Sequence, residues 1–117
     1  MLFDHALEEL CADVQGTLHR FSGNRGLLKK FMLKFPQDAT FEKLSAAVAQ
    51  GDYEAVETTA HTLKGVAANL GFMRLYEACG DLVQAVRQGQ YETISALFEL
   101  TKEEYEKIVS CLTRVED

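Results

Sequence analysis

The chain has 117 residues, of which 47% are hydrophobic, and its formal net charge is -6 at pH 7. This length fits one domain with one core and is too short for a catalytic domain joined to a regulatory one. The acidic balance disfavours binding to nucleic acid and anionic lipid. No apolar run approaches the roughly 18 residues of a membrane span. The acidic N-terminal segment lacks the basic start of a secretory signal. We therefore expect a cytoplasmic protein that binds other proteins.

Apolar residues recur at helical spacing along most of the chain, and strand-like alternation is almost absent, so the sequence predicts an all-α fold. A first helix is expected to run from Phe3 to Val14, and Leu18 and Phe21 continue or restart it. Residues 1–22 are expected to form an N-terminal helical cap over one end of the fold.

A second helix is expected to begin after Asn24, a favourable N-cap residue, and to end at Pro36, which disfavours helix at the preceding residue. Its apolar stripe, which we place in the core, consists of Leu27, Leu28, Phe31, Met32 and Phe35. A shorter helix carrying Phe41, Leu44 and Val48 then ends at Gly51, after which Asp52 caps the next helix.

Three long helices are predicted for the rest of the chain, at residues 53–70, 72–86 and 94–112, with Gly71 and Gly89 as stops. Their short connections make consecutive helices antiparallel. The sequence therefore predicts an antiparallel up-and-down four-helix bundle over residues 24–112, in which the helix of residues 24–35 is the fourth member.

The three cysteines do not indicate a disulfide framework or a zinc site. Cys11, Cys79 and Cys111 are odd in number, lack C-x-x-C spacing and lie among apolar residues. We expect buried, reduced thiols and no metal bound through cysteine.

One histidine stands out, in the segment TTAHTLKGVAANLGF of the helix at residues 53–70. At about 100° per residue, His61 points roughly 130° and Gly65 roughly 170° from the centre of the apolar stripe, whereas Lys64 lies at its edge, at about 70°. A glycine inside a helix costs about 1 kcal/mol relative to alanine, and the apolar pattern continues past Gly65. We infer that an approaching partner needs the space beside His61.

An exposed imidazole is a nucleophile at neutral pH and can accept a phosphoryl group. The added negative charge would lie beside Lys64, whose flexible stem allows its ammonium to reach back about one turn and stabilise it. Glu57, Thr58 and Ala68 share this face at helical offsets. We predict that these three residues and Gly65 contact a docked partner.

The segment AHTLKGVAANLG resembles the signature of histidine-containing phosphotransfer (HPt) domains, and GLLKKFMLKF and LYEACGDLVQAVRQG resemble the same family. The resemblance implies a phosphocarrier without kinase activity, in which His61 receives a phosphoryl group from the aspartate of one receiver domain and passes it to another. It implies receiver domains of a hybrid sensor kinase or a response regulator as partners. The required Mg²⁺ would belong to the receiver, so we expect this chain to hold no cofactor. We also expect the chain to be a monomer.

One position departs from the family pattern. In many members a glutamate or glutamine on the adjacent helix forms a hydrogen bond with the histidine ring, and the matching residue here is Val83. Gln84 is next in sequence but points about 100° away around its helix. Arg87, one turn after Val83, is predicted to add a second positive charge near the phosphoryl group.

Two other classes of function fit parts of the sequence. Glu57 and His61, four residues apart on a helix, could ligate a metal, but no third ligand follows at a suitable spacing and a catalytic zinc site needs three. A non-catalytic helical adaptor fits the composition equally well. It leaves unexplained why an outward histidine has a glycine beside it.

Overall fold

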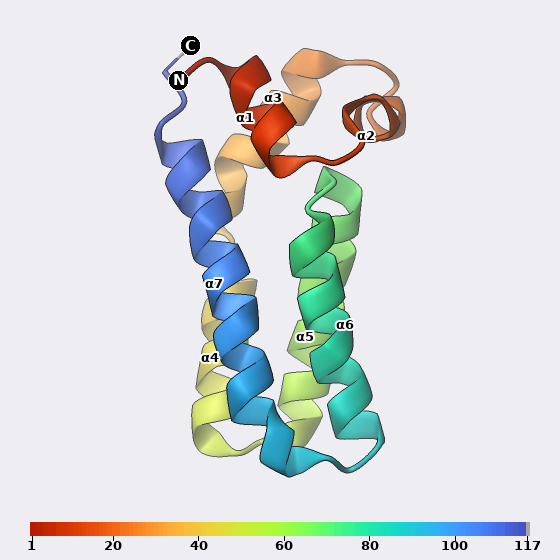
Figure 1. Ribbon diagram of the computed structural model, residues 1–117, viewed down its shortest axis with the longest axis vertical. Coiled ribbons are helices and arrows are strands. Elements are labelled where there is room, and N and C mark those ends of the chain that lie inside the picture. The colour runs from red at the N-terminus through yellow and green to blue at the C-terminus, as the bar shows by residue number, and fades with distance from the viewer. Residues whose placement is uncertain (117) are drawn as a thin grey trace.

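The computed structural model describes residues 1–116, which are helical over most of their length and contain no strand (Figure 1). The α-helices are α1 (Phe3–Leu10), α2 (Val14–Arg20), α3 (Arg25–Lys34), α4 (Thr40–Gln50), α5 (Tyr53–Leu70), α6 (Met73–Arg87) and α7 (Ile94–Thr113), and two 3-10 turns are η1 (Phe35–Gln37) and η2 (Tyr91–Thr93). The predicted all-α bundle is confirmed. Within residues 1–116, no helix combines the length and apolar character needed to cross a membrane.

Helices α5, α6 and α7 run antiparallel because their connections are short (Figure 1). Asp52 caps α5 by accepting a hydrogen bond from the Ala55 amide at 3.2 Å. Gly71 ends α5 in the left-handed conformation, with φ at +81°, and the chain turns directly into α6. Both of these helix ends agree with the predicted cap and stop.

The fourth position of the bundle is filled by two helices in succession, so the prediction that the helix of residues 24–35 fills it alone was wrong. The 20 residues of α7 extend about 30 Å, whereas the 11 residues of α4 extend only about 16 Å. Figure 1 shows α4 beside the lower part of α7 and α3 near the top. The rings of Phe35 in η1 and Phe41 in α4 both contact Tyr105, which fixes the junction near the middle of α7.

The N-terminal cap contains two helices separated by a break, where the sequence predicted continuous helix from Phe3 to Val14. The side chain of Asp13 accepts a hydrogen bond from the Gly16 amide at 2.9 Å and so starts α2. The Cys11 thiol donates to the Leu70 carbonyl at 3.5 Å, which brings the break against the end of α5. Figure 1 shows α1 and α2 lying across the top of the bundle.

The core differs from prediction in α3. Leu28, Met32 and Phe35 are buried as expected, but Leu27 is 39% exposed and Phe31 is 47% exposed. Leu27 and Phe31 each lie one residue, or about 100°, away from the buried positions that follow them. They are therefore turned away from the bundle, and the apolar stripe of α3 is wider than the surface that covers it.

The three cysteines are buried and free, as predicted. Burial raises the pKa of Cys79 to about 12, although the nearby Lys64 ammonium acts in the opposite direction. A thiol with such a pKa is protonated at neutral pH and unreactive as a nucleophile.

Candidate functional site

The predicted phosphoacceptor lies on a helix that is firmly anchored in the core. One face of α5 is buried, through Val56, Ala60, Leu63, Ala67 and Leu70. His61 lies on the opposite, exposed face, and no residue within 1–116 forms a hydrogen bond or ion pair with its ring. The backbone under the imidazole is held in place while both ring nitrogens are left open to a partner.

The surface on either side of His61 presents few competing groups. The Thr58 hydroxyl donates to the Glu54 carbonyl at 3.0 Å, and the Thr62 hydroxyl donates to the Thr58 carbonyl at 3.1 Å. These hydroxyls are therefore engaged by the backbone of α5 itself. On the C-terminal side, a Cβ added to Gly65 would meet no atom within 4 Å, and Ala68 is half-buried.

Glu57 and Arg87 form an ion pair between α5 and α6. The Arg87 Nε donates to the Glu57 carboxylate at 3.1 Å, and the Arg87 side chain is exposed while Glu57 is half-buried. Arg87 thus pairs with the residue that lies one turn before His61 on α5, and its charge is partly balanced by Glu57. Its predicted contact with a phosphoryl group stays a prediction.

Lys64 extends across α6 in the structure. Its Nζ lies 5.1 Å from the centre of the Tyr76 ring, within the range of a cation–π contact. Its stem passes Gly80, where an added Cβ would lie 3.7 Å from the Lys64 Cε. The reach of this ammonium toward a phosphoryl group on His61 also stays a prediction.

Val83 is fully buried in the face of α6 that packs on the core, and Gln84 is exposed. Neither is hydrogen-bonded to His61. At the position where the family pattern has a hydrogen-bonding side chain, α6 therefore presents a buried apolar residue that cannot hydrogen-bond the His61 ring.

Three residues near the site were missed or misplaced by sequence reasoning. Phe31 was assigned to the core, and Tyr76 and Gly80 were not singled out. Gly80 carried a usable signal, because a glycine in the middle of a helix without a helix stop indicates that something lies close to its backbone. The contacts of Phe31 and Tyr76 depend on packing between helices and had no local signal.

A hollow of about 240 Å³ adjoins the His61 face of α5. Its lining comes from α3, η1 and the end of α5, and consists of Phe31, Lys34, Phe35, Asp38, Val66, Asn69 and Leu70. At about 100° per residue, Gly65 lies about 40° and Asn69 about 80° around α5 from His61, so the hollow lies to one side of the histidine. The exposed ring of Phe31 therefore stands beside the face that carries the histidine.

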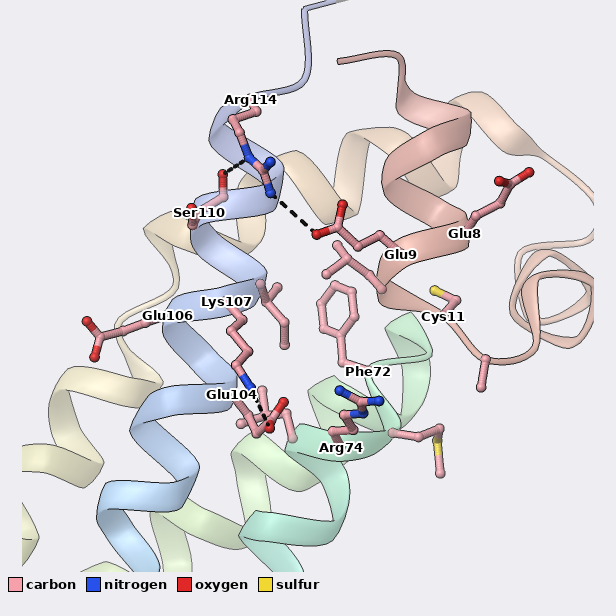
Figure 2. A pocket seen from close by; sticks show the side chains of 15 residues that line it. Glu8, Glu9, Cys11, Phe72, Arg74, Glu104, Glu106, Lys107, Ser110 and Arg114 are labelled. Carbon is pink, nitrogen blue, oxygen red and sulfur yellow. Dashed lines mark hydrogen bonds and ion pairs between the residues drawn. The ribbon is translucent and has the colours of Figure 1, made fainter.

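A larger hollow of about 620 Å³ lies between α1, the start of α6 and the second half of α7 (Figure 2). None of the predicted site residues lines it. The pairs shown in Figure 2, Arg114 with Glu9 and Lys107 with Glu104, each at 3.4 Å, join charges within its wall. Within residues 1–116, no group of three histidine, cysteine or acidic side chains is placed to hold a metal ion.

Substitutions of Gly65 should separate stability from function. Gly65→Ala is expected to leave the fold intact and to raise stability by up to about 1 kcal/mol, because alanine is the better helix former and its Cβ meets open space. Gly65→Gln should keep that stability but slow phosphoryl transfer, because its side chain obstructs the approach to His61. Thermal melting and transfer rate, measured on both variants, test this. Unfolding of Gly65→Gln, or transfer at the parental rate, would contradict it.

Comparisons with known proteins show which family this chain belongs to. The model of the Hpt domain family matches residues 26–111. The crystal structure of histidine-containing phosphotransfer protein B (HptB) from Pseudomonas aeruginosa PAO1 is similar, with a TM-score of 0.64 and 27% sequence identity over 95% of this chain and 90% of that chain. The comparison with curated proteins gave no match. Since the family model covers most of the chain, including the whole of α5 and α6, this protein belongs to the family of Hpt domains.

Proposed function

We propose that His61 is the phosphoacceptor through which this chain carries a phosphoryl group between receiver domains of a phosphorelay. The observation that carries the proposal is an exposed imidazole, free of hydrogen bonds within residues 1–116, on a rigid helix beside a glycine with open space around it. An adaptor bundle would not require this arrangement. Membership of the Hpt family supports the same role.

For the transfer itself, this chain mainly has to position the His61 imidazole in line with the phosphorus. An unprotonated imidazole nitrogen attacks the phosphorus of the receiver's aspartyl phosphate, a nitrogen–phosphorus bond forms, and the phosphorus–oxygen bond to the aspartate breaks. The bonding electron pair leaves with the aspartate carboxylate, and the other imidazole nitrogen keeps its proton. The reverse sequence loads the next receiver. We propose that Mg²⁺ is supplied by the receiver, so that this chain contributes an aligned nucleophile and the cation of Lys64.

The docking surface of the receiver is proposed to extend from His61 toward α3. The hollow beside Phe31, Val66 and Asn69 lies next to the histidine face, and its lining combines apolar with polar and charged residues, as protein interfaces do. Glu57, which was predicted to contact the partner, lies on the opposite side of His61 and is already paired with Arg87. We propose that the partner covers both sides of the ring.

A labelling experiment tests the proposed function. Incubation with a phosphorylated receiver should transfer label to this chain in a linkage that is labile to acid and stable to base, as expected for phosphohistidine. Incubation with ATP alone should give no label, because the sequence has no G-x-x-x-x-G-K-[ST] motif and no kinase glycine-rich loop. A chain that stays unlabelled by any receiver, and instead binds partners without transfer, would be an adaptor and not a carrier.

Phe31 offers a test of the docking surface. Phe31→Ala should raise the receiver concentration needed for half-maximal transfer by about tenfold, because aromatic anchors dominate interface energetics. The maximal rate should change little, since Phe31 does not touch the reacting atoms. Transfer measured against receiver concentration gives both quantities.

Leu100→Ala is the matched control for Phe31→Ala. Leu100 is 54% exposed, on α7, and lines neither hollow. Its replacement should leave both quantities unchanged. Equal effects of the two substitutions would remove Phe31 from the docking surface.

A further inference from the structure

The position of Lys64 is unusual for a residue expected to stabilise a phosphoryl group on its own helix. The side chain leaves α5, crosses to α6 and is only partly exposed. No carboxylate within residues 1–116 pairs with its ammonium. The contact that holds the charge is the face of the Tyr76 ring, 5.1 Å from Nζ.

Gly80 provides the surface on which the Lys64 stem lies. A Cβ built at Gly80 would be 3.7 Å from Cε and 3.9 Å from Nζ, which is ordinary contact. A longer side chain at Gly80 would occupy the same volume as the stem. The bare backbone of α6 at this position therefore allows Lys64 to lie flat between the two helices.

Tyr76 holds the end of the same side chain. The ring is half-buried and packs against the core, so its orientation is fixed by neighbours other than Lys64. A cation over the face of a fixed aromatic ring is attracted by the ring quadrupole. Tyr76 and Gly80 together form a cradle on α6, and Lys64 occupies it when His61 carries no phosphoryl group.

We propose that Tyr76 and Gly80 are positioning residues that hold the Lys64 ammonium in a resting place on α6 and release it when His61 is phosphorylated. This inference rests on the proposed function of His61. A partly exposed cation–π contact biases an equilibrium by only about two- to fivefold, whereas hydrogen bonds from an ammonium to a phosphoryl group are charge-assisted and stronger. On phosphorylation the Lys64 ammonium therefore moves to the phosphoryl group. The competing contact with Tyr76 weakens the interaction between the ammonium and the phosphoryl group by the same two- to fivefold.

The first experiment follows the Lys64 ε-methylene protons by NMR. In the unmodified chain these protons should be shifted upfield by the Tyr76 ring current, and the shift should persist in Tyr76→Phe and disappear in Tyr76→Leu. Phosphorylation of His61 with phosphoramidate should reduce the shift in the parent chain. An upfield shift that survives phosphorylation unchanged would overturn the release, and the absence of any shift in the unmodified chain would overturn the resting position.

The second experiment measures the half-life of the phosphorylated chain. Tyr76→Leu should lengthen it about two- to fivefold, because the ammonium is no longer held on α6, and Tyr76→Phe should restore the parental value. In a Lys64→Met background, Tyr76→Leu should have no effect, since the charge is absent. An equal effect of Tyr76→Leu in both backgrounds would show that Tyr76 acts through packing and not through Lys64.

Substitution of Gly80 provides an independent route that leaves Tyr76 intact. Gly80→Met keeps a good helix former in α6 but displaces the Lys64 stem, so it should lengthen the half-life as Tyr76→Leu does and remove the upfield shift. Gly80→Ala should do neither, because its Cβ fits beside the stem. Retention of the upfield shift in Gly80→Met would overturn the role of Gly80.

The two proposals fail in different ways. If neither phosphoramidate nor a phosphorylated receiver labels His61, the proposed function is wrong, and the release of Lys64 is wrong with it. If His61 is labelled and the Lys64 shift and half-life do not respond as described, the phosphocarrier role stands and the cradle does not.

Discussion

Replacing His61 with alanine is expected to abolish phosphoryl acceptance while changing stability by no more than about 0.5 kcal/mol. The acceptance is lost because the nucleophilic nitrogen is removed, and no other histidine lies on α5. Stability is retained because the imidazole is exposed and makes no hydrogen bond within residues 1–116. Acid-labile, base-stable label transferred from a phosphorylated receiver, together with thermal melting, measures both effects.

The chain contains its own controls for this experiment. His5 in α1 and His19 in α2 are also exposed, and both lie in the N-terminal cap. His5→Ala and His19→Ala should accept label at the parental rate. Label that persists in His61→Ala, or disappears in either control, would contradict the assignment of the acceptor to His61.

Gly71→Ala is expected to destabilise the fold by about 2–4 kcal/mol, the largest stability effect that we predict for a single methyl group. Two costs add at this position. The residue adopts a φ of +81°, where a side chain with Cβ is strained, and the new Cβ would collide with the Thr17 hydroxyl and press on the Cys11 sulfur. Urea denaturation of the parent and the variant gives the difference.

Gly51→Ala separates the two costs. Gly51 ends α4 with a φ of +66°, but a Cβ there would meet no atom within 4 Å. It should therefore show only the backbone cost, about 1–2 kcal/mol. Thr17→Ala combined with Gly71→Ala should recover part of the additional loss, because it removes the colliding hydroxyl and methyl. Equal losses for Gly51→Ala and Gly71→Ala would show that the N-terminal cap does not press on the end of α5.

Helix ends were predictable where the signal is local. Asn24 accepts a hydrogen bond from the Leu27 amide at 2.9 Å, and Asp52 and Gly71 cap and stop α5 as expected. These residues act on their own backbone, so residue type and position are sufficient. The break after α1 was missed because apolar spacing runs through it, although Asp13 is an N-cap residue of the same kind.

Contacts between helices could not be predicted from helical spacing. The angular position of His61 on α5 predicted its exposure, because only the helix's own geometry is involved. The same geometry placed Lys64 at the edge of the apolar stripe, but which neighbour it meets depends on Gly80 and Tyr76 across the interface. Phe31 shows the same limit. Its apolar character is evident from the sequence, but whether another helix covers it depends on the arrangement of the whole bundle.

The exposed ring of Phe31 and the ring of His61, the proposed phosphoacceptor, lie on different helices, α3 and α5. Because Leu27 and Phe31 on the outer face of α3 are exposed, substitutions there leave the buried residues that anchor α5 in place. If Phe31 contacts the receiver, as proposed, substitutions in α3 change which receiver such a chain accepts while His61 and its helix stay the same. Under that proposal, partner choice and phosphoryl chemistry are free to diverge at different rates.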